Sequence, residues 1–314
     1  MYFHRMIVFD ELLQGLKNGD RRYLARAITI VENELSGYEE FLPKLSVDKQ
    51  IPVTGITGPP GAGKSTLINA LLKNLSAKKN AAGDPYQIAV LAVDPSSPFT
   101  HGSLLGDRLR MYEHFNNPNI YIRSLATRGA LGGLSAKTLE VIDVMRSAAF
   151  DHIIIETVGV GQSEVEIVAL ADTTIVVLVP EAGDEIQAIK SGIMEIADIF
   201  VVNKSDREGA DRFAANVIKT LHERPYKNNW NVPVMKTIAS GNEGVDALVE
   251  MIYKHLQQVP PEKNLQLLAE RTYRLIQQEK MRSISVQDLL VELTVAMKEK
   301  DFNVYEFVRK VIAK

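Results

Sequence analysis

Short runs of almost uninterrupted apolar residues recur through the middle of the sequence, and they restrict its fold more than any other feature. A strand this apolar must be covered on both faces, as in a parallel sheet that lies between two layers of helices. Helix-length segments separate the runs. The sequence therefore predicts an α/β fold with a mainly parallel sheet and helices on both faces. The predicted strands are 51–57, 87–93, 120–124, 152–156, 174–179, 199–203 and 233–237.

The segment before the first strand is typical of helices. Asp20 can cap a helix in which Leu24, Ile28, Val31 and Leu35 recur at helical spacing. An apolar stripe of this kind needs a surface to cover it. We therefore expect the N-terminal helices to lie against the body that follows.

The segment after the last strand is again helical, and Pro260 and Pro261 predict the boundary because proline disfavours continuing a helix through it. Two apolar stripes follow, and Ser285 with Asp288 indicates a capped helix start. The roughly 50 residues of this part are too few to build much of a core alone, so they either dock on the main domain or pair with a second copy. The expected parts are a helical extension at 1–48, an α/β domain at 49–260 and a helical arm at 261–314.

Residues 58–65 match the phosphate-binding pattern GxxxxGK[ST], with a predicted strand before it and a predicted helix after it. The glycines let backbone N–H groups point inward, and the helix N-terminus adds partial positive charge. Lys64 would reach the β- and γ-phosphates as a catalytic group, and Ser65 would offer its hydroxyl to Mg²⁺. The predicted phosphate-binding residues are Gly58, Pro60, Gly61, Ala62, Gly63, Lys64, Ser65 and Thr66.

Carboxylates at the same edge of the sheet are candidates for the metal site, because Mg²⁺ prefers hard oxygen ligands and ligands gather at the carboxyl ends of parallel strands. Asp94 and Glu156 each end a predicted strand, and Asp107 follows in the stretch after Asp94. The predicted metal ligands are thus Ser65, Asp94, Asp107 and Glu156. Such acids also serve as helix caps, most plausibly in the case of Asp107.

The segment IFVVNKSD at 199–206 indicates whether the nucleotide is a guanine or an adenine nucleotide. A strand that ends in Asn-Lys-x-Asp indicates guanine recognition, since Asp206 can accept two hydrogen bonds from the guanine edge. Adenine would leave that carboxylate unpaired, which is a strong basis for discrimination. Asn203 would tether neighbouring loops, and the stem of Lys204 would cover the base plane. Ala239 and Ser240, after the next strand, could offer N–H groups to the guanine carbonyl.

After Glu156 the sequence continues Thr-Val-Gly-Val-Gly-Gln-Ser, which places Gly159 where a backbone N–H can sense the γ-phosphate. In Ras-like GTPases the following residue is the Gln that orients the attacking water. Here it is Val160, so we expect slow basal hydrolysis unless another group assists, with Gln162 as one candidate. Segment 180–192 follows a strand at the same edge. It either lies near the nucleotide or the dimer surface, or is a solvated helix start.

Composition excludes several classes of protein. The net charge of −3 gives no reason to expect a nucleic-acid or anionic-membrane partner, and the absence of cysteine excludes thiolate metal sites and thiol catalysis. No apolar run approaches the ~20 residues of a membrane span. Asp10 and Glu11 stand where a signal peptide would still be apolar. We expect a cytoplasmic protein.

The chain resembles the MeaB/ArgK-type GTPases along almost its whole length. The segments that carry the resemblance are GDRRYLARAIT, GPPGAGKST, LAVDPSSPFTHGSLLGDRLRM, TRGALGGLS, IIIETVGVGQSE, GDEIQAIKSGI and NKSD. It implies a SIMIBI-type G domain with an N-terminal helical extension and a C-terminal arm that makes a homodimer. It also implies a GTP-driven chaperone that gates cofactor loading and protects an adenosylcobalamin-dependent acyl-CoA mutase, notably methylmalonyl-CoA mutase.

The resemblance also assigns roles by matching positions. It implies a phosphate and Mg²⁺ set of Lys64, Ser65, Asp94, Asp107 and Glu156, and a base set of Asn203, Lys204 and Asp206. Three switch segments would lie at 94–107, 156–166 and 180–192. The last one begins Pro-Glu-Ala-Gly, with Glu181 where the family more often has glycine.

Two other functions remain open. One is an ATPase or kinase linked to lysine, arginine and ornithine transport, against which NKSD argues. The other is a metal-insertion GTPase of the SIMIBI class, which usually carries Cys/His motifs; this chain has no cysteine and only six histidines.

Overall fold

The computed structural model describes most of the chain in ten stretches. They are residues 9–48, 50–94, 111–126, 136–157, 167–181, 193–222, 230–258, 261–281, 284–298 and 301–313. The chain divides into two compact units, Met1–Asn264 and Leu265–Lys314.

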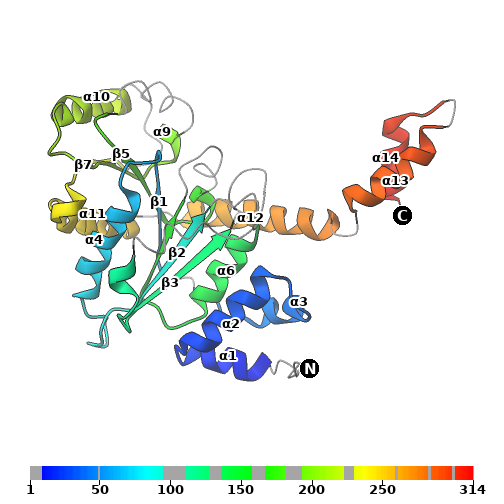
Figure 1. Ribbon diagram of the computed structural model, residues 1–314, viewed down its shortest axis with the longest axis horizontal. Helices are drawn as coiled ribbons and strands as arrows, with labels where there is room; N and C mark the ends of the chain where they lie inside the picture. Colours follow the sequence, from blue (N-terminus) through cyan, green and yellow to red (C-terminus); the bar gives the residue numbers. More distant parts are fainter. Residues whose placement is uncertain are drawn as a thin grey trace. The chain divides into compact units, whose positions relative to one another are not determined.

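The first unit is built on a seven-stranded sheet in which every pair of neighbours is parallel (Figure 1). The strand order is β3-β2-β4-β1-β5-β6-β7, so β1 lies at the centre with β4 and β5 beside it. This confirms the predicted α/β fold. The strands are β1 (Val53–Thr57), β2 (Ile88–Asp94), β3 (Ile120–Ala126), β4 (His152–Glu156), β5 (Thr173–Leu178), β6 (Ile199–Val202) and β7 (Val234–Lys236).

Helices cover both faces of the sheet because its buried residues alternate between two cores. In β2, for example, Val90 belongs to one cluster and the adjacent Leu91 to the other. The first core takes in α4 (Lys64–Ser76), α10 (Ala210–His222) and α11 (Val245–Leu256), and the second takes in α1 (Phe9–Lys17), α2 (Arg21–Glu32) and α6 (Ala136–Arg146). Figure 1 shows the sheet between these two sets of helices. Short helices at α3 (Tyr38–Phe41), α9 (Ile193–Ile196), η1 (Leu42–Lys44), η2 (Tyr112–His114), η3 (Ile167–Ala169) and η4 (Ala239–Gly241) complete this unit.

The N-terminal helices lie against the sheet domain, as their apolar stripe predicts. The Asp20 carboxylate caps α2 by accepting from the Arg22 N–H at 2.8 Å, and Leu24, Ile28 and Val31 are fully buried in the second core. The stripe does not extend to Leu35. The helix ends at Glu32, and Leu35 is 42% exposed beyond it.

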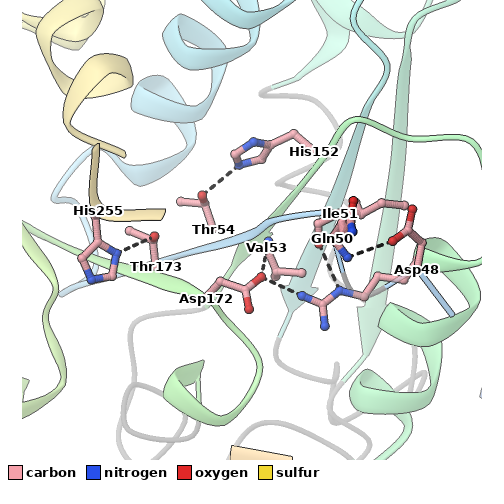
Figure 2. A network of polar contacts seen from close by, with 10 residues as sticks. Asp48, Gln50, Ile51, Val53, Thr54, His152, Asp172, Thr173 and His255 are labelled. Carbon is pink, nitrogen blue, oxygen red and sulfur yellow. Dashed lines mark hydrogen bonds and ion pairs between the residues drawn. The ribbon is translucent and has the colours of Figure 1, made fainter. Parts of the chain in front are cut away.

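The amino-terminal ends of the central strands are joined by buried polar contacts (Figure 2). His152 Nε2 lies 2.8 Å from Thr54 Oγ1, and His255 Nδ1 lies 2.8 Å from Thr173 Oγ1 on the neighbouring strand. The Asp172 carboxylate accepts from the Val53 N–H at 2.8 Å. Parallel strands place these contacts at the edge of the sheet opposite to the carboxyl ends, so they support the sheet away from the predicted nucleotide site.

The second unit contains the rest of the C-terminal helices: most of α12 (Pro261–Met281), then α13 (Val286–Ala296) and α14 (Val304–Ile312). The Ser285 hydroxyl accepts from the Asp288 N–H at 3.0 Å and so caps α13, as predicted. None of the residues of α13 and α14 is buried. Among the described residues, no helix is both long and apolar enough to cross a membrane.

Candidate functional site

The phosphate-binding pattern lies in the turn between β1 and α4, at the carboxyl edge of the sheet. Gly58 has φ +138°, and a Cβ there would approach the Val177 carbonyl oxygen to 2.1 Å. Gly63 has φ +87°, and a Cβ there would lie 2.5 Å from Asn203 Nδ2. Both positions therefore require glycine, because a side chain would be strained by its φ and would also clash. The turn therefore lies close to β5 and to the residue that follows β6.

Lys64 is folded back onto this turn. Its Nζ donates to the Gly58 carbonyl at 2.7 Å and to the Pro59 carbonyl at 3.1 Å, and the residue is only 7% exposed. An ammonium group at the N-terminus of α4 is suited to an anionic ligand. Ala62 is buried within the turn, whereas Pro60, Gly61 and Thr66 are exposed and Gly63 is half-buried.

Ser65, the second residue of α4, meets the last residue of β4. Its Oγ donates to Glu156 Oε1 at 2.7 Å, and the two residues are 5% exposed each. Nearby, the Thr157 hydroxyl donates to the Thr57 hydroxyl at 2.8 Å and so joins the ends of β4 and β1. A hydroxyl and a carboxylate in contact form the kind of hard-oxygen donor set that Mg²⁺ prefers. These two oxygens therefore suit part of a magnesium site.

The other predicted metal ligands are only partly described. Asp94 ends β2, and the register of β2 with β4 places Ala92 opposite Glu156, so both acids belong to the same edge of the sheet. Asp107 lies outside the described residues, and so does Gly159. Among the residues that the structure describes, no group of three His, Cys, Asp or Glu side chains could hold a metal ion.

Asn203 connects the predicted base-binding loop to the phosphate-binding turn. Its Nδ2 donates to the Ala62 carbonyl at 3.0 Å, while its Oδ1 accepts from the Ala239 N–H and from the Thr237 hydroxyl, each at 3.1 Å. The residue is 2% exposed. One buried amide therefore fixes three loops against one another, which is the tethering that the sequence predicts for it.

The remaining base-loop residues surround this amide. Lys204 has φ +55°, and its Nζ donates to the Gly61 carbonyl at 2.8 Å, so its stem crosses from the base loop to the turn. Asp206 is exposed, and Ser240 is exposed in η4 next to the buried Ala239. The structure thus brings the predicted phosphate and base residues to one edge of the sheet.

Comparison with known proteins identifies the family. A sequence model described as methylmalonyl Co-A mutase-associated GTPase MeaB matches residues 24–298. The chain belongs to the MeaB family. This MeaB-family chain is 42% identical over 311 residues to a Pyrococcus abyssi protein with a provisional GTPase name, covering 98% of this chain and 92% of the relative. A Pyrococcus horikoshii protein with the same provisional name is 48% identical over 250 residues, covering 78% of this chain and 77% of the relative.

A solved structure supports the α/β fold of this MeaB-family protein. A crystal structure described as an LAO/AO transport system kinase gives a TM-score of 0.68 at 25% identity and covers 98% of both chains. Together with the GTPase relatives, this similarity shows a P-loop GTP hydrolase that binds GTP and GDP.

Three contacts of this MeaB-family site were missed from the sequence. The hydrogen bond from the Thr237 hydroxyl to Asn203 Oδ1 could have been predicted, because Thr237 ends a predicted strand at the same edge as Asn203. An ion pair joins Glu181, which follows β5, to Arg207, which follows Asp206. A hydrogen bond of 2.9 Å joins Asn74 in α4 to Asn242 after η4. The Asn74–Asn242 contact had no such signal, since Asn74 lies near the C-terminal end of α4 and 168 residues from its partner.

Proposed function

We propose that this chain is a Mg²⁺-dependent GTPase whose GTP-bound and GDP-bound states act on an adenosylcobalamin-dependent acyl-CoA mutase, with methylmalonyl-CoA mutase as the first candidate. The family supports the link to that mutase, since its description names a methylmalonyl-CoA mutase-associated GTPase. The proposed action is that of a chaperone that gates cofactor loading and protects the mutase. GTP and GDP would favour different conformations and so bias a bound client.

The observation that carries the nucleotide assignment is the position of Asn203. Its amide contacts the phosphate-binding turn at Ala62 and the loop of Ala239 at the same time. A purine nucleotide could contact both loops at once, with its phosphates at the turn and its base at the loop of Ala239. In this assignment Asp206 recognises the guanine N–H groups, and the N–H groups of Ala239 and Ser240 meet the guanine carbonyl.

The proposed chemistry is charge stabilisation at the phosphates. Lys64 would exchange its two backbone carbonyl partners for β- and γ-phosphate oxygens, with little further desolvation because it is already buried. Ser65 and Glu156 would hold Mg²⁺ together with Asp94 and Asp107. The metal, when bound, neutralises charge that develops on the phosphate oxygens. Gly159 remains the proposed γ-phosphate sensor, and slow basal hydrolysis remains a prediction from Val160.

The decisive test of the base assignment is Asp206→Asn, assayed for binding of GTP, XTP and ATP. The wild-type protein should prefer GTP strongly, because an adenine edge leaves the carboxylate unpaired. The variant should lose GTP affinity by on the order of 100-fold and should gain relative affinity for XTP, whose extra carbonyl accepts from an amide. The matched control is Asp211→Asn, an exposed acid in α10 that pairs with Lys236. Equal binding of ATP and GTP by the wild-type protein would overturn the assignment.

The client is tested by capture and then with purified components. Protein loaded with a non-hydrolysable GTP analogue should retain a corrinoid enzyme, and GDP-loaded protein should retain a different amount of it. Purified methylmalonyl-CoA mutase should then load adenosylcobalamin at a rate that depends on which nucleotide the GTPase carries. A loading rate that is the same with both nucleotides, and the same without the GTPase, would contradict the chaperone proposal.

We also propose that the protein is a homodimer formed by its C-terminal arm. Apolar side chains along the arm are exposed, and covering them would be favourable. They include Val286 at 81%, Leu290 at 66%, Tyr305 at 79% and Ile312 at 73%. Sedimentation should show a dimer at micromolar concentration that Leu290→Glu weakens and the control Gln287→Glu, at an exposed polar position of the same helix, does not. A monomeric wild-type protein would contradict this proposal.

A kinase for basic amino acids or their binding proteins is the second candidate, because the similar crystal structure carries the name of a transport system kinase. Incubation with γ-labelled GTP or ATP and with lysine, arginine or ornithine separates the two functions. Our proposal expects labelled inorganic phosphate and no labelled acceptor. A metal-insertion role is disfavoured because the sequence has no cysteine. A cytoplasmic location stays a prediction.

A further inference from the structure

The loop that carries Ala239 and Ser240 is closed on itself. The Ile238 N–H donates to the Glu243 carbonyl at 3.0 Å, and the Glu243 N–H donates back to the Ile238 carbonyl at 3.2 Å. This pair of hydrogen bonds fixes the two ends of the loop to each other. It does not fix the loop to the rest of the site, so other contacts must do so.

One such contact is at the beginning of the loop. The Ala239 N–H donates to Asn203 Oδ1 at 3.1 Å, and the same amide holds the phosphate-binding turn through Ala62. This contact belongs to the Asn-Lys-x-Asp motif and is buried. It ties only the side of the loop that lies next to β6.

The second contact is at the end of the loop, and the motif does not include it. Asn74 Nδ2 donates to Asn242 Oδ1 at 2.9 Å and to the Ala70 carbonyl of its own helix at 3.0 Å. The two N–H groups of the Asn74 amide can each serve one of these bonds. Asn74 belongs to α4, whose first two residues are Lys64 and Ser65. The end of the loop is therefore attached to the helix that begins at the phosphate site.

The backbone conformation of Asn242 does not by itself explain why this residue is asparagine. The residue has φ +59°, a left-handed conformation that glycine adopts at the lowest cost and asparagine tolerates. The backbone alone would be served at least as well by glycine. What asparagine adds at this position is an oxygen that accepts from Asn74.

We propose that Asn74 and Asn242 are a positioning pair for guanine recognition, which holds the loop of Ala239 and Ser240 at a fixed distance from the phosphate-binding helix. The inference rests on the proposed base assignment. Tied at Ala239 by Asn203 and at Asn242 by Asn74, the loop presents its N–H groups in one position. Without the second tether the loop gains freedom, and ordering it on binding reduces affinity for the base. Affinity for the phosphates alone should not change.

The test compares three variants for binding of GDP and of inorganic pyrophosphate, which probes the phosphate site without a base. Asn242→Gly removes the acceptor and keeps the backbone conformation. Asn74→Ala removes the donor. Asn242→Asp keeps an acceptor oxygen facing Asn74 and is the conservative control. We expect Asn242→Gly and Asn74→Ala each to lower the affinity for GDP about threefold to tenfold through faster dissociation, because one hydrogen bond is lost. Pyrophosphate binding should be unchanged. Asn242→Asp should stay within about twofold of the wild-type protein.

A role in stability alone predicts a different result, so the thermal midpoint is measured as well. Glycine relieves the left-handed strain at position 242 but loses the hydrogen bond and adds freedom to the unfolded chain, so Asn242→Gly should shift the thermal midpoint only slightly while binding GDP more weakly. The double variant Asn74→Ala/Asn242→Gly should bind GDP no more weakly than either single variant, because both remove the same bond. Additive losses, or equal weakening of GDP and pyrophosphate, would overturn the proposal.

The failure of this inference can be distinguished from failure of the base assignment. If the wild-type protein prefers GTP over ATP and Asp206→Asn removes that preference, the assignment stands. Unchanged GDP affinity in Asn242→Gly would then reject the positioning pair alone. A wild-type protein without guanine preference would reject both the base assignment and the positioning pair.

Discussion

The hydroxyl of Ser65 donates to the carboxylate of Glu156 at 2.7 Å, although 91 residues separate the two in the sequence. Ser65 lies in the first turn of α4 and Glu156 ends β4, so the bond joins the helix of the phosphate site to the strand beside β1. Both side chains are buried. The proposed metal site therefore has two of its oxygen donors already oriented.

Ser65→Ala should raise the Mg²⁺ concentration needed for half-maximal GTP hydrolysis by about tenfold or more, because one proposed oxygen ligand is lost. The measurement is phosphate release over a Mg²⁺ titration, with chelator as the zero point. Ser76→Ala is the matched control, since Ser76 ends α4 and its hydroxyl donates to the Lys73 carbonyl at 3.2 Å. An unchanged Mg²⁺ requirement in Ser65→Ala would remove Ser65 from the metal site.

Lys64→Ala should lower kcat for GTP hydrolysis by on the order of 100-fold, because the ammonium group is proposed to stabilise charge on the transferring phosphate. Phosphate release at saturating GTP measures this effect, and fluorescent GDP binding shows whether the nucleotide is still held. The control is Lys73→Ala in the same helix, whose exposed ion pair with Glu113 contributes little. Full activity in Lys64→Ala would contradict the role of Lys64.

Burial lowers the pKa of His152 from 6.5 to about 4. The unfolded chain thus binds a proton at this imidazole below about pH 6.5, whereas the folded chain does so only near pH 4. The contribution of His152 to the free energy of unfolding is therefore largest above pH 6.5. It decreases as the pH falls, by about 2 kcal/mol between pH 7 and pH 5. Denaturant unfolding at both pH values measures the loss.

His152→Gln should flatten this pH dependence, although the variant is less stable at pH 7 because it changes the buried contact with Thr54. The control His222→Gln, at an exposed position of α10, should keep the wild-type pH dependence. An equally steep loss in His152→Gln would show that another group causes it.

The ion pair of Glu181 and Arg207 should contribute less than about 1 kcal/mol to stability, because both side chains are nearly half exposed. It nevertheless joins the start of the third proposed switch segment to the residue beside Asp206. In a double-mutant cycle of Glu181→Gln and Arg207→Gln, we expect a small coupling in the GDP dissociation rate that disappears in 1 M salt. A coupling that persists at high salt would contradict this view of the pair as a screened surface interaction.

Much of the fold could be predicted because its signals are local. Short β-rich runs, most of them nearly continuous apolar stretches, predicted the seven strands. The prediction 152–156 matches β4, while 51–57 begins two residues before β1. Strand ends depend on hydrogen bonding with neighbours, which a single run does not specify. Leu35 shows the same limit: its spacing suited the stripe of α2, but the helix ends three residues earlier and leaves it exposed.

The amino-acid sequence by itself determined the layered α/β class, the phosphate-binding turn and the guanine motif, because each depends on residue types at fixed short spacings. Only the tertiary structure decided which groups meet across the site. Asn203 reaches Ala62 over 141 residues, and Asn74 reaches Asn242 over 168. Such hydrogen bonds form only where folding brings a donor within about 3 Å of an acceptor, and no local pattern records that distance.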